Sequence, residues 1–111
     1  MRIAIPVMEA KENAEVSPHF GRAPFFAIFD TETENLDFIR NSSEHFGGRG
    51  KPAEIIAEQK SDCVFALDMG SKAIALFKSL DIKVKTGSFA TLEEVIKNQA
   101  LLEELEKSCG H

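Results

Sequence analysis

The hydrophobic positions of this 111-residue chain fall into short runs separated by polar, turn-rich segments. Two runs, Phe25–Phe29 and Cys63–Leu67, are apolar at every position, which is typical of strands buried on both faces of a sheet. Three others, Arg2–Val7, Leu36–Arg40 and Ile82–Lys85, show the two-residue alternation of a strand with one buried face. The pattern therefore predicts five strands.

Apolar residues recur at helical spacing in three further segments. The first begins at Pro52, whose ring suits the first turn of a helix. The second follows the turn Asp68–Ser71, with Ser71 expected as the N-cap. The third begins after Thr91, which forms a predicted capping box with Glu94. The residues expected to be buried are Ala73, Leu76, Phe77 and Leu80 in the second helix, and Leu92, Val95, Ile96, Leu102 and Leu105 in the third.

The resulting order, β-β-β-α-β-α-β-α, predicts an α/β protein with a mixed five-stranded sheet and helices packed on it in three layers. Fully apolar strands belong in the interior and the alternating strands Leu36–Arg40 and Ile82–Lys85 at the edges. This favours the strand order 3-2-1-4-5, the ribonuclease-H-like arrangement. A crevice is then expected where strands one and four end. We expect one domain over residues 1–111, with a flexible tail from about residue 106.

A net charge of -5 argues against nucleic acid and anionic membranes as partners. No apolar run is long enough to span a bilayer, and the first residues resemble a strand rather than a signal peptide. Cys63 lies in an apolar run and Cys109 near the end of the sequence, so no structural disulfide is predicted and a cytoplasmic protein is expected.

The stretch Ser17–Pro24 is the strongest candidate for a functional site. It is a polar loop between two predicted core strands, and it holds His19, a possible metal ligand, and Arg22, a possible anion contact. The turn before the second helix adds backbone donors at Gly70 and Ser71, because free amide groups at a helix start favour an anion.

Two more loops are candidate walls of the same crevice. One is the segment from Asn41 to Lys51, which contains His45 and Gly48, and the other is Thr86–Ser88. A glycine in such a loop permits close approach of an anion, although flexible-loop glycines are commoner.

Each candidate also has a purely structural interpretation. His19 could only hydrogen-bond its own loop, and Arg22 could pair with Asp30 or with a backbone carbonyl. His45 could be an exposed loop residue. The other polar and sulfur-containing residues are weaker candidates. Cys63 is expected to lie in the core and Met69 to have a packing role, and Cys109 and His111 are expected to belong to an inert tail. Asp30 and Asp68 are too few carboxylates for two-metal catalysis.

Several stretches of the chain resemble one known family, over residues 1 to about 97. They are Met1–Val7, Ser17–Asp30 with its HFGRAP motif, Gly47–Gly50, Lys72–Phe77 and Asp81–Val84. On these residues the chain is similar to the dinitrogenase iron-molybdenum cofactor biosynthesis family, which includes NifX, NafY and the C-terminal domain of NifB. The resemblance implies a ribonuclease-H-like fold and a stand-alone member of the family.

The resemblance further implies non-catalytic binding, carriage or storage of an iron-sulfur or molybdenum-containing metallocluster, with cluster donor and acceptor proteins as partners. His19 would be the metal ligand, and Arg22, Gly70, Ser71, His45 and Gly48 would complete the cofactor site. No paired cysteines lie near the crevice, so the cluster would be bound preformed. The alternative is a metal-free module that binds an anion or a partner at the same helix start. An enzyme is not predicted, since no nucleophile–base pair is evident.

Overall fold

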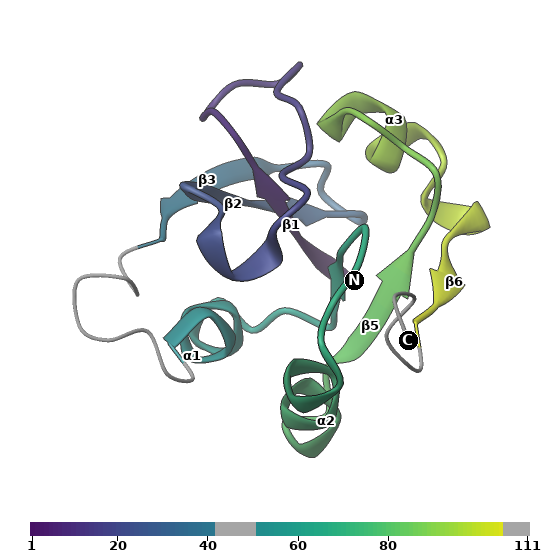
Figure 1. Ribbon diagram of the computed structural model, residues 1–111. Coiled ribbons are helices and arrows are strands. Elements are labelled where there is room, and N and C mark those ends of the chain that lie inside the picture. Colours follow the sequence, from purple (N-terminus) through teal and green to yellow (C-terminus); the bar gives the residue numbers. More distant parts are fainter. Residues whose placement is uncertain (42–50, 106–111) are drawn as a thin grey trace.

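The structure is a computed structural model that describes residues 1–41 and 51–105. Its described residues form one six-stranded sheet in the order β3-β2-β1-β4-β5-β6 (Figure 1). In chain order the elements are β1 (Arg2–Val7), the 3-10 turn η1 (Phe20–Arg22), β2 (Phe25–Asp30), β3 (Leu36–Arg40), α1 (Lys51–Glu58), β4 (Cys63–Phe65), α2 (Ser71–Ser79), β5 (Lys83–Thr86), α3 (Leu92–Lys97), the 3-10 turn η3 (Gln99–Leu101) and β6 (Glu103–Glu104).

The sheet joins an antiparallel half to a parallel half at β1. β1 pairs antiparallel with β2, which pairs antiparallel with β3. On its other side β1 runs parallel to β4, and β4 runs parallel to β5. The predicted order of the first five strands and the α/β class are confirmed. The ribonuclease-H-like label and the single-domain boundaries stay predictions.

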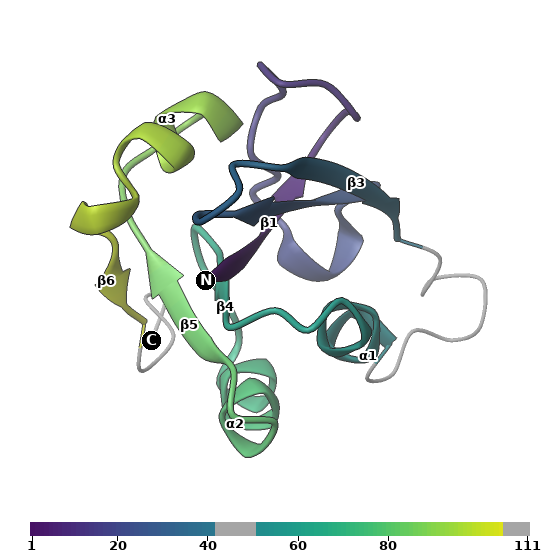
Figure 2. The ribbon, with the colours of Figure 1, turned by 180° about the vertical axis from the view of Figure 1, so that it is seen from behind.

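Both faces of the sheet are covered, which explains why β2 and β4 are apolar throughout. Phe26, Ile28 and Val64 belong to the core beneath α1 and α2. Ala27 and Phe65 belong to the second core, on the opposite face, which includes α3 and the chain after β1. Figures 1 and 2 show α1 and α2 together on one side of the sheet and α3 on the other.

The expectation of five strands is wrong, because the chain after α3 returns to the sheet as β6. Helical spacing suggested that Leu102 and Leu105 continue the third helix. Instead α3 ends at Lys97, and Leu105 packs in the first core while Leu102 packs against the second. The amide of Leu105 donates to the carbonyl of Val84 at 2.8 Å. A segment whose apolar side chains reach opposite faces of a sheet suits an extended strand.

Three smaller expectations also need correction. β5 is not an edge strand, since β6 pairs with it. β4 ends at Phe65 rather than at Leu67. On α2 the buried side chains are Ile74 and Phe77, whereas Leu76 and Leu80 are 39% and 42% exposed. Among the described residues, no helix is both long and apolar enough to cross a bilayer.

Candidate functional site

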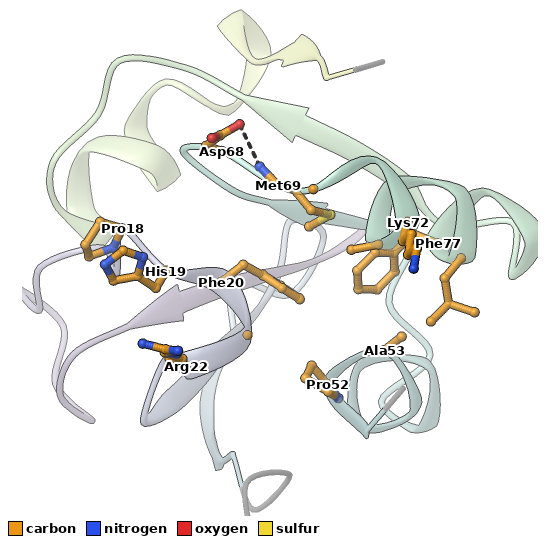
Figure 3. Close-up of a pocket in the computed structure, with 14 residues that line it drawn as sticks. Pro18, His19, Phe20, Arg22, Pro52, Ala53, Asp68, Met69, Lys72 and Phe77 are labelled. Atoms are coloured by element: carbon orange, nitrogen blue, oxygen red, sulfur yellow. Dashed lines mark hydrogen bonds between the residues drawn. The ribbon is translucent and has the colours of Figure 1, made fainter. Parts of the chain in front are cut away.

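β1 and β4 are parallel neighbours, so their carboxyl ends lie side by side. The loops that follow these two ends run in different directions. The chain after β1 leads to η1 and the antiparallel half, and the chain after β4 leads to α2 and the parallel half. Ligands of open α/β sheets bind at such a divergence of neighbouring strands. A cavity of about 560 Å³ lies there, between η1 and the starts of α1 and α2 (Figure 3).

The loop after β1 is held in place by its backbone. The end of the loop returns beside β1: Met8 N donates to Glu15 O at 2.9 Å, and Ser17 N donates to Pro6 O at 2.9 Å. The buried Ser17 hydroxyl donates to the carbonyl of His19 at 3.1 Å and accepts from its amide at 3.3 Å. This local turn satisfies a buried hydroxyl and fixes the backbone of His19.

Phe20 anchors the next turn to the core. Its ring lies 5.4 Å from that of Phe26 and 5.4 Å from that of Phe77, edge-on to the latter at 82°. The side chain is only 8% exposed, whereas its neighbours His19, Gly21 and Arg22 are exposed. Burial of one aromatic side chain therefore presents the polar groups on either side of it.

A second anchor comes from Asn41, just after β3. Its side-chain amide is buried and donates to the carbonyl of Ala23 at 2.8 Å and to that of Gly21 at 3.2 Å. Gly21 belongs to the η1 turn and Ala23 is its C-cap, so Asn41 ties this turn to the end of β3. Sequence reasoning missed this role.

The opposite wall is the start of α2. Its N-cap is Gly70, which corrects the assignment of Ser71; Ser71 is the first helical residue and its side chain makes no capping bond. The backbone of Gly70 is extended, with φ -65°, so this position does not need glycine for its conformation. A Cβ added there would meet no atom within 4 Å. An open position beside the cavity leaves room for a ligand at the backbone.

The first turn of α2 carries positive charge only. The first turn of α2 carries no acidic residue, and its exposed Lys72 lines the cavity. A lysine at this end of a helix is unfavourable to the helix dipole. This placement, visible in the sequence, makes Lys72 a candidate site residue. It was not among the predicted site residues.

The cavity has an apolar floor and a rim with several charged groups (Figure 3). Figure 3 shows His19 and Arg22 on the η1 side and Lys72 across from them on α2. Asp68 is the one acidic residue that the described part of the chain contributes to the cavity lining, and its carboxylate accepts a hydrogen bond from the Met69 amide at 2.9 Å. The floor is formed by Phe20, Ala53, Met69, Ala73 and Phe77.

The structure brings together three of the predicted site residues, His19, Arg22 and Gly70. Ser71 is adjacent but does not line the cavity, and the loop Thr86–Ser88 does not reach it. His45 and Gly48 lie outside the described residues.

The pairing of Arg22 with Asp30 is not found. The carboxylate of Asp30 lies 4.0 Å from the guanidinium of Arg2 instead, and it accepts the backbone amides of Glu32 and Thr33. Those backbone bonds lower the pKa of Asp30. Within residues 1–41 and 51–105, the Arg22 guanidinium has no hydrogen bond or ion pair, which leaves it available to a ligand.

The donor set restricts the metal chemistry. In the described ranges no group of three or more His, Cys, Asp or Glu side chains could hold a metal ion. Cys63 is buried in the second core, as predicted, and burial raises the pKa of its thiol to about 11. The described residues therefore provide no four-cysteine cluster site, and His19 supplies the one imidazole that they place at the cavity.

A mixed α/β sheet with a ligand-sized cavity at its switch point defines a class of small binding domains. The profile of one family, described as dinitrogenase iron-molybdenum cofactor, matches residues 1–100. The chain belongs to this family, and the resemblance drawn from its sequence is confirmed.

Its relatives agree in sequence and in fold. An uncharacterized protein of Methanocaldococcus jannaschii is 31% identical over 102 residues, which cover 87% of this chain and 83% of that protein. The NMR structure of a Thermotoga protein assigned to NifB is 28% identical and superimposes with a TM-score of 0.82, over 96% of this chain and 94% of the other. The apo form of the orange protein from Desulfovibrio gigas has the same fold, with a TM-score of 0.86 at 20% identity, over 96% and 94% of the two chains.

Proposed function

We propose that this protein binds and carries a preformed metal–sulfur cluster of the iron-sulfur or molybdenum-containing type, without catalysing a reaction. The cluster is its cargo, received from a donor protein and passed to an acceptor. Membership of the iron-molybdenum cofactor family supports this cargo class. Carriage by this particular chain is the proposal.

The observation that carries the proposal is the cavity with His19 and Arg22 on one wall and Lys72 on the other, above an apolar floor. Cluster anions are large and bring their own bridging sulfides, so they need few protein ligands. In this arrangement His19 supplies one imidazole ligand, and Arg22 and Lys72 offset the negative charge. The first turn of α2, which holds no acidic residue, adds favourable potential for an anion.

The experiment is an anaerobic titration with tetrathiomolybdate, a molybdenum–sulfide dianion, followed by visible absorbance of the protein fraction after gel filtration. The chain contains neither Trp nor Tyr, so protein absorbance hardly overlaps that of the probe. We expect coloured protein from the wild type and loss of the colour in His19→Ala. Colourless wild-type protein, or binding unchanged by His19→Ala, would contradict the proposal.

A charge-matched pair on α2 tests the rim. Lys72→Gln and Lys78→Gln each remove one exposed lysine from the same helix, but only Lys72 lines the cavity. A hydrogen bond to a charged group is worth about 1.5 kcal/mol, so Lys72→Gln should weaken binding about tenfold. Lys78→Gln should leave it nearly unchanged. Equal effects of the two variants would mean that general charge, not the cavity, attracts the anion.

Gly70→Ala tests whether the ligand approaches the start of α2. The added methyl meets no protein atom within 4 Å, so the free protein should keep its stability. Weaker binding by a variant of unchanged stability would show that the ligand occupies this space. Unchanged binding would show that the ligand does not approach Gly70.

The second candidate function is a metal-free module for a phosphate-bearing ligand. The exposed Arg22 and the first turn of α2, which holds no acidic residue, favour it because both suit an oxyanion. It predicts binding of inorganic phosphate that depends on Arg22 and Ser71 but survives His19→Ala. Calorimetric titration of the same variants with phosphate therefore separates the two functions.

A further inference from the structure

The outer edge of β3 presents a regular row of backbone groups. Asp30 N donates to Asn35 O at 3.0 Å, and Asn41 N donates to Pro24 O at 2.9 Å. Asn35 and Asn41 therefore bond toward β2, at the two ends of β3. Hydrogen-bonded pairs alternate with non-bonded pairs along an antiparallel ladder. The even-numbered residues between them thus direct their N–H and C=O groups away from β2.

These outward residues are Leu36, Phe38 and Arg40. On the side away from β2 no described strand accepts or donates to them, since β3 is the last strand at that end of the sheet. The other edge strand, β6, is only two residues long, and both are exposed glutamates. Shortness and charge are the usual protections of an edge strand. β3 is longer, with five residues, and its two charges, Asp37 and Arg40, are of opposite sign.

The side chains of this edge add an apolar surface. Phe38 and Leu36 are half-buried and pack with Phe25 against the second core. Figures 1 and 2 both show α3, which lies on that core, at the opposite end of the sheet from β3. The surface beside Phe38 is therefore continuous with the core, and no helix of residues 1–41 and 51–105 covers it.

We propose that the β3 strands of two copies of this chain pair antiparallel about a two-fold axis at Phe38. In this register Phe38 lies opposite its counterpart, and Leu36 lies opposite Arg40 of the second copy. Each of the outward residues then belongs to a hydrogen-bonded pair, so the free N–H and C=O groups of both edges find partners. The two sheets become one continuous sheet.

The partner is a second copy because the strand is complementary to itself. A two-fold axis perpendicular to the sheet makes each face of one copy continuous with the same face of the other. Directly opposed residues of the two strands therefore lie on the same face. The exposed charges then meet apolar residues: Arg40 meets Leu36, and Asp37 meets Ile39 on the other face. Self-pairing of β6 in either register would oppose glutamates, and like charges directly opposite each other are unfavourable.

The dimer is independent of the proposed cargo. No residue of β3 lines the cavity, so pairing at this edge leaves its described walls as they are. The small contact predicts a dimer that dissociates on dilution. Sedimentation velocity across a wide concentration range should therefore show a mass that rises from 12.3 kDa toward twice that value. A mass that stays at 12.3 kDa at the highest concentration would overturn the proposal.

A matched pair of variants tests the register. Leu36→Glu and Leu36→Lys remove the same apolar group, but the first places an opposite charge and the second a like charge against Arg40 of the other copy. Their dimer dissociation constants should differ about tenfold or more, with Leu36→Glu the tighter. Asp37→Asn, which faces Ile39 in the dimer, should behave as wild type. A dimer on which Leu36→Glu and Leu36→Lys act alike would lie elsewhere and refute the pairing.

Amide exchange measured by NMR gives a readout for single residues. In the dimer the amides of Leu36, Phe38 and Arg40 should become protected as concentration rises, while that of Asp37 is protected throughout by β2. Free exchange of the three outward amides in a sample whose mass is dimeric would exclude β3 as the contact.

Discussion

Replacement of Phe20 by alanine should both destabilise the fold and weaken ligand binding. Phe20 is the side chain that attaches the η1 turn to the core, through ring contacts at 5.4 Å to Phe26 and Phe77. Its truncation leaves His19 and Arg22 chemically intact but removes the anchor between them. A change in binding therefore measures how well His19 and Arg22 are positioned, because their own chemical groups are unchanged.

The size of the effect follows from burial. Truncation of a buried Phe to Ala costs about 3–5 kcal/mol, of which part is the energy of the cavity left behind. Phe20 is 8% exposed and lines the open cavity, so water can enter the vacated space. We therefore expect the lower end, about 3 kcal/mol, or a fall in Tm of about 12 °C for a domain of this size. Phe20→Leu keeps most of the apolar volume and should cost about 1 kcal/mol.

Urea unfolding followed by far-ultraviolet circular dichroism measures this change, since the chain has no Trp for fluorescence. Phe25→Ala is the control, because Phe25 is half-buried, packs against the opposite face and does not line the cavity. It should reduce stability by a smaller amount and leave tetrathiomolybdate binding unchanged. A loss below about 1 kcal/mol for Phe20→Ala would refute the anchoring role, given the usual cost of such truncations.

Three further predictions concern stability. Thr91→Ala removes the capping box with Glu94 and should cost about 1 kcal/mol in urea unfolding. Burial raises the pKa of Cys63 from 9.0 to about 11, so its thiol stays neutral in the folded chain while the unfolded chain loses its proton first. The free energy of unfolding should thus be unaffected below pH 9 and fall as pH rises toward 11, by on the order of 2 kcal/mol, and Cys63→Ala should lack this part of the decline. Asn41→Ala leaves the Ala23 carbonyl without its donor and should cost about 1–3 kcal/mol, measured as a lower urea midpoint.

The strand order was predictable because the apolar pattern reports how many faces of a strand are buried. β2 and β4 are apolar throughout and lie inside the sheet, and β3 alternates and lies at its edge. β6 was not predictable in this way. A three-residue spacing between Leu102 and Leu105 fits a helix as well as an irregular segment, and the deciding partner is the carbonyl of Val84 on a distant strand.

The position of the candidate site was predictable to the extent that it depends on local chemistry. His19 and Arg22 stand out because a turn-rich loop between core strands has few structural uses for them. Asn41 was missed because its partner Ala23 is 18 residues away in sequence. Lys72 was missed although its placement at a helix start, against the dipole, could have indicated it.

In the loop after β1, the residues that anchor the backbone differ from those that face the cavity. Ser17, Phe20 and Ala23 are buried, whereas His19 and Arg22 between them are exposed at the cavity. Phe20 and Ala23 lie three residues apart around the 3-10 turn Phe20–Arg22, and residues three apart on such a turn share one face. Substitutions on the buried face should therefore change stability and binding together, whereas substitutions of the exposed residues should change binding alone. An equal loss of stability in His19→Ala and Phe20→Ala would show that this separation does not exist.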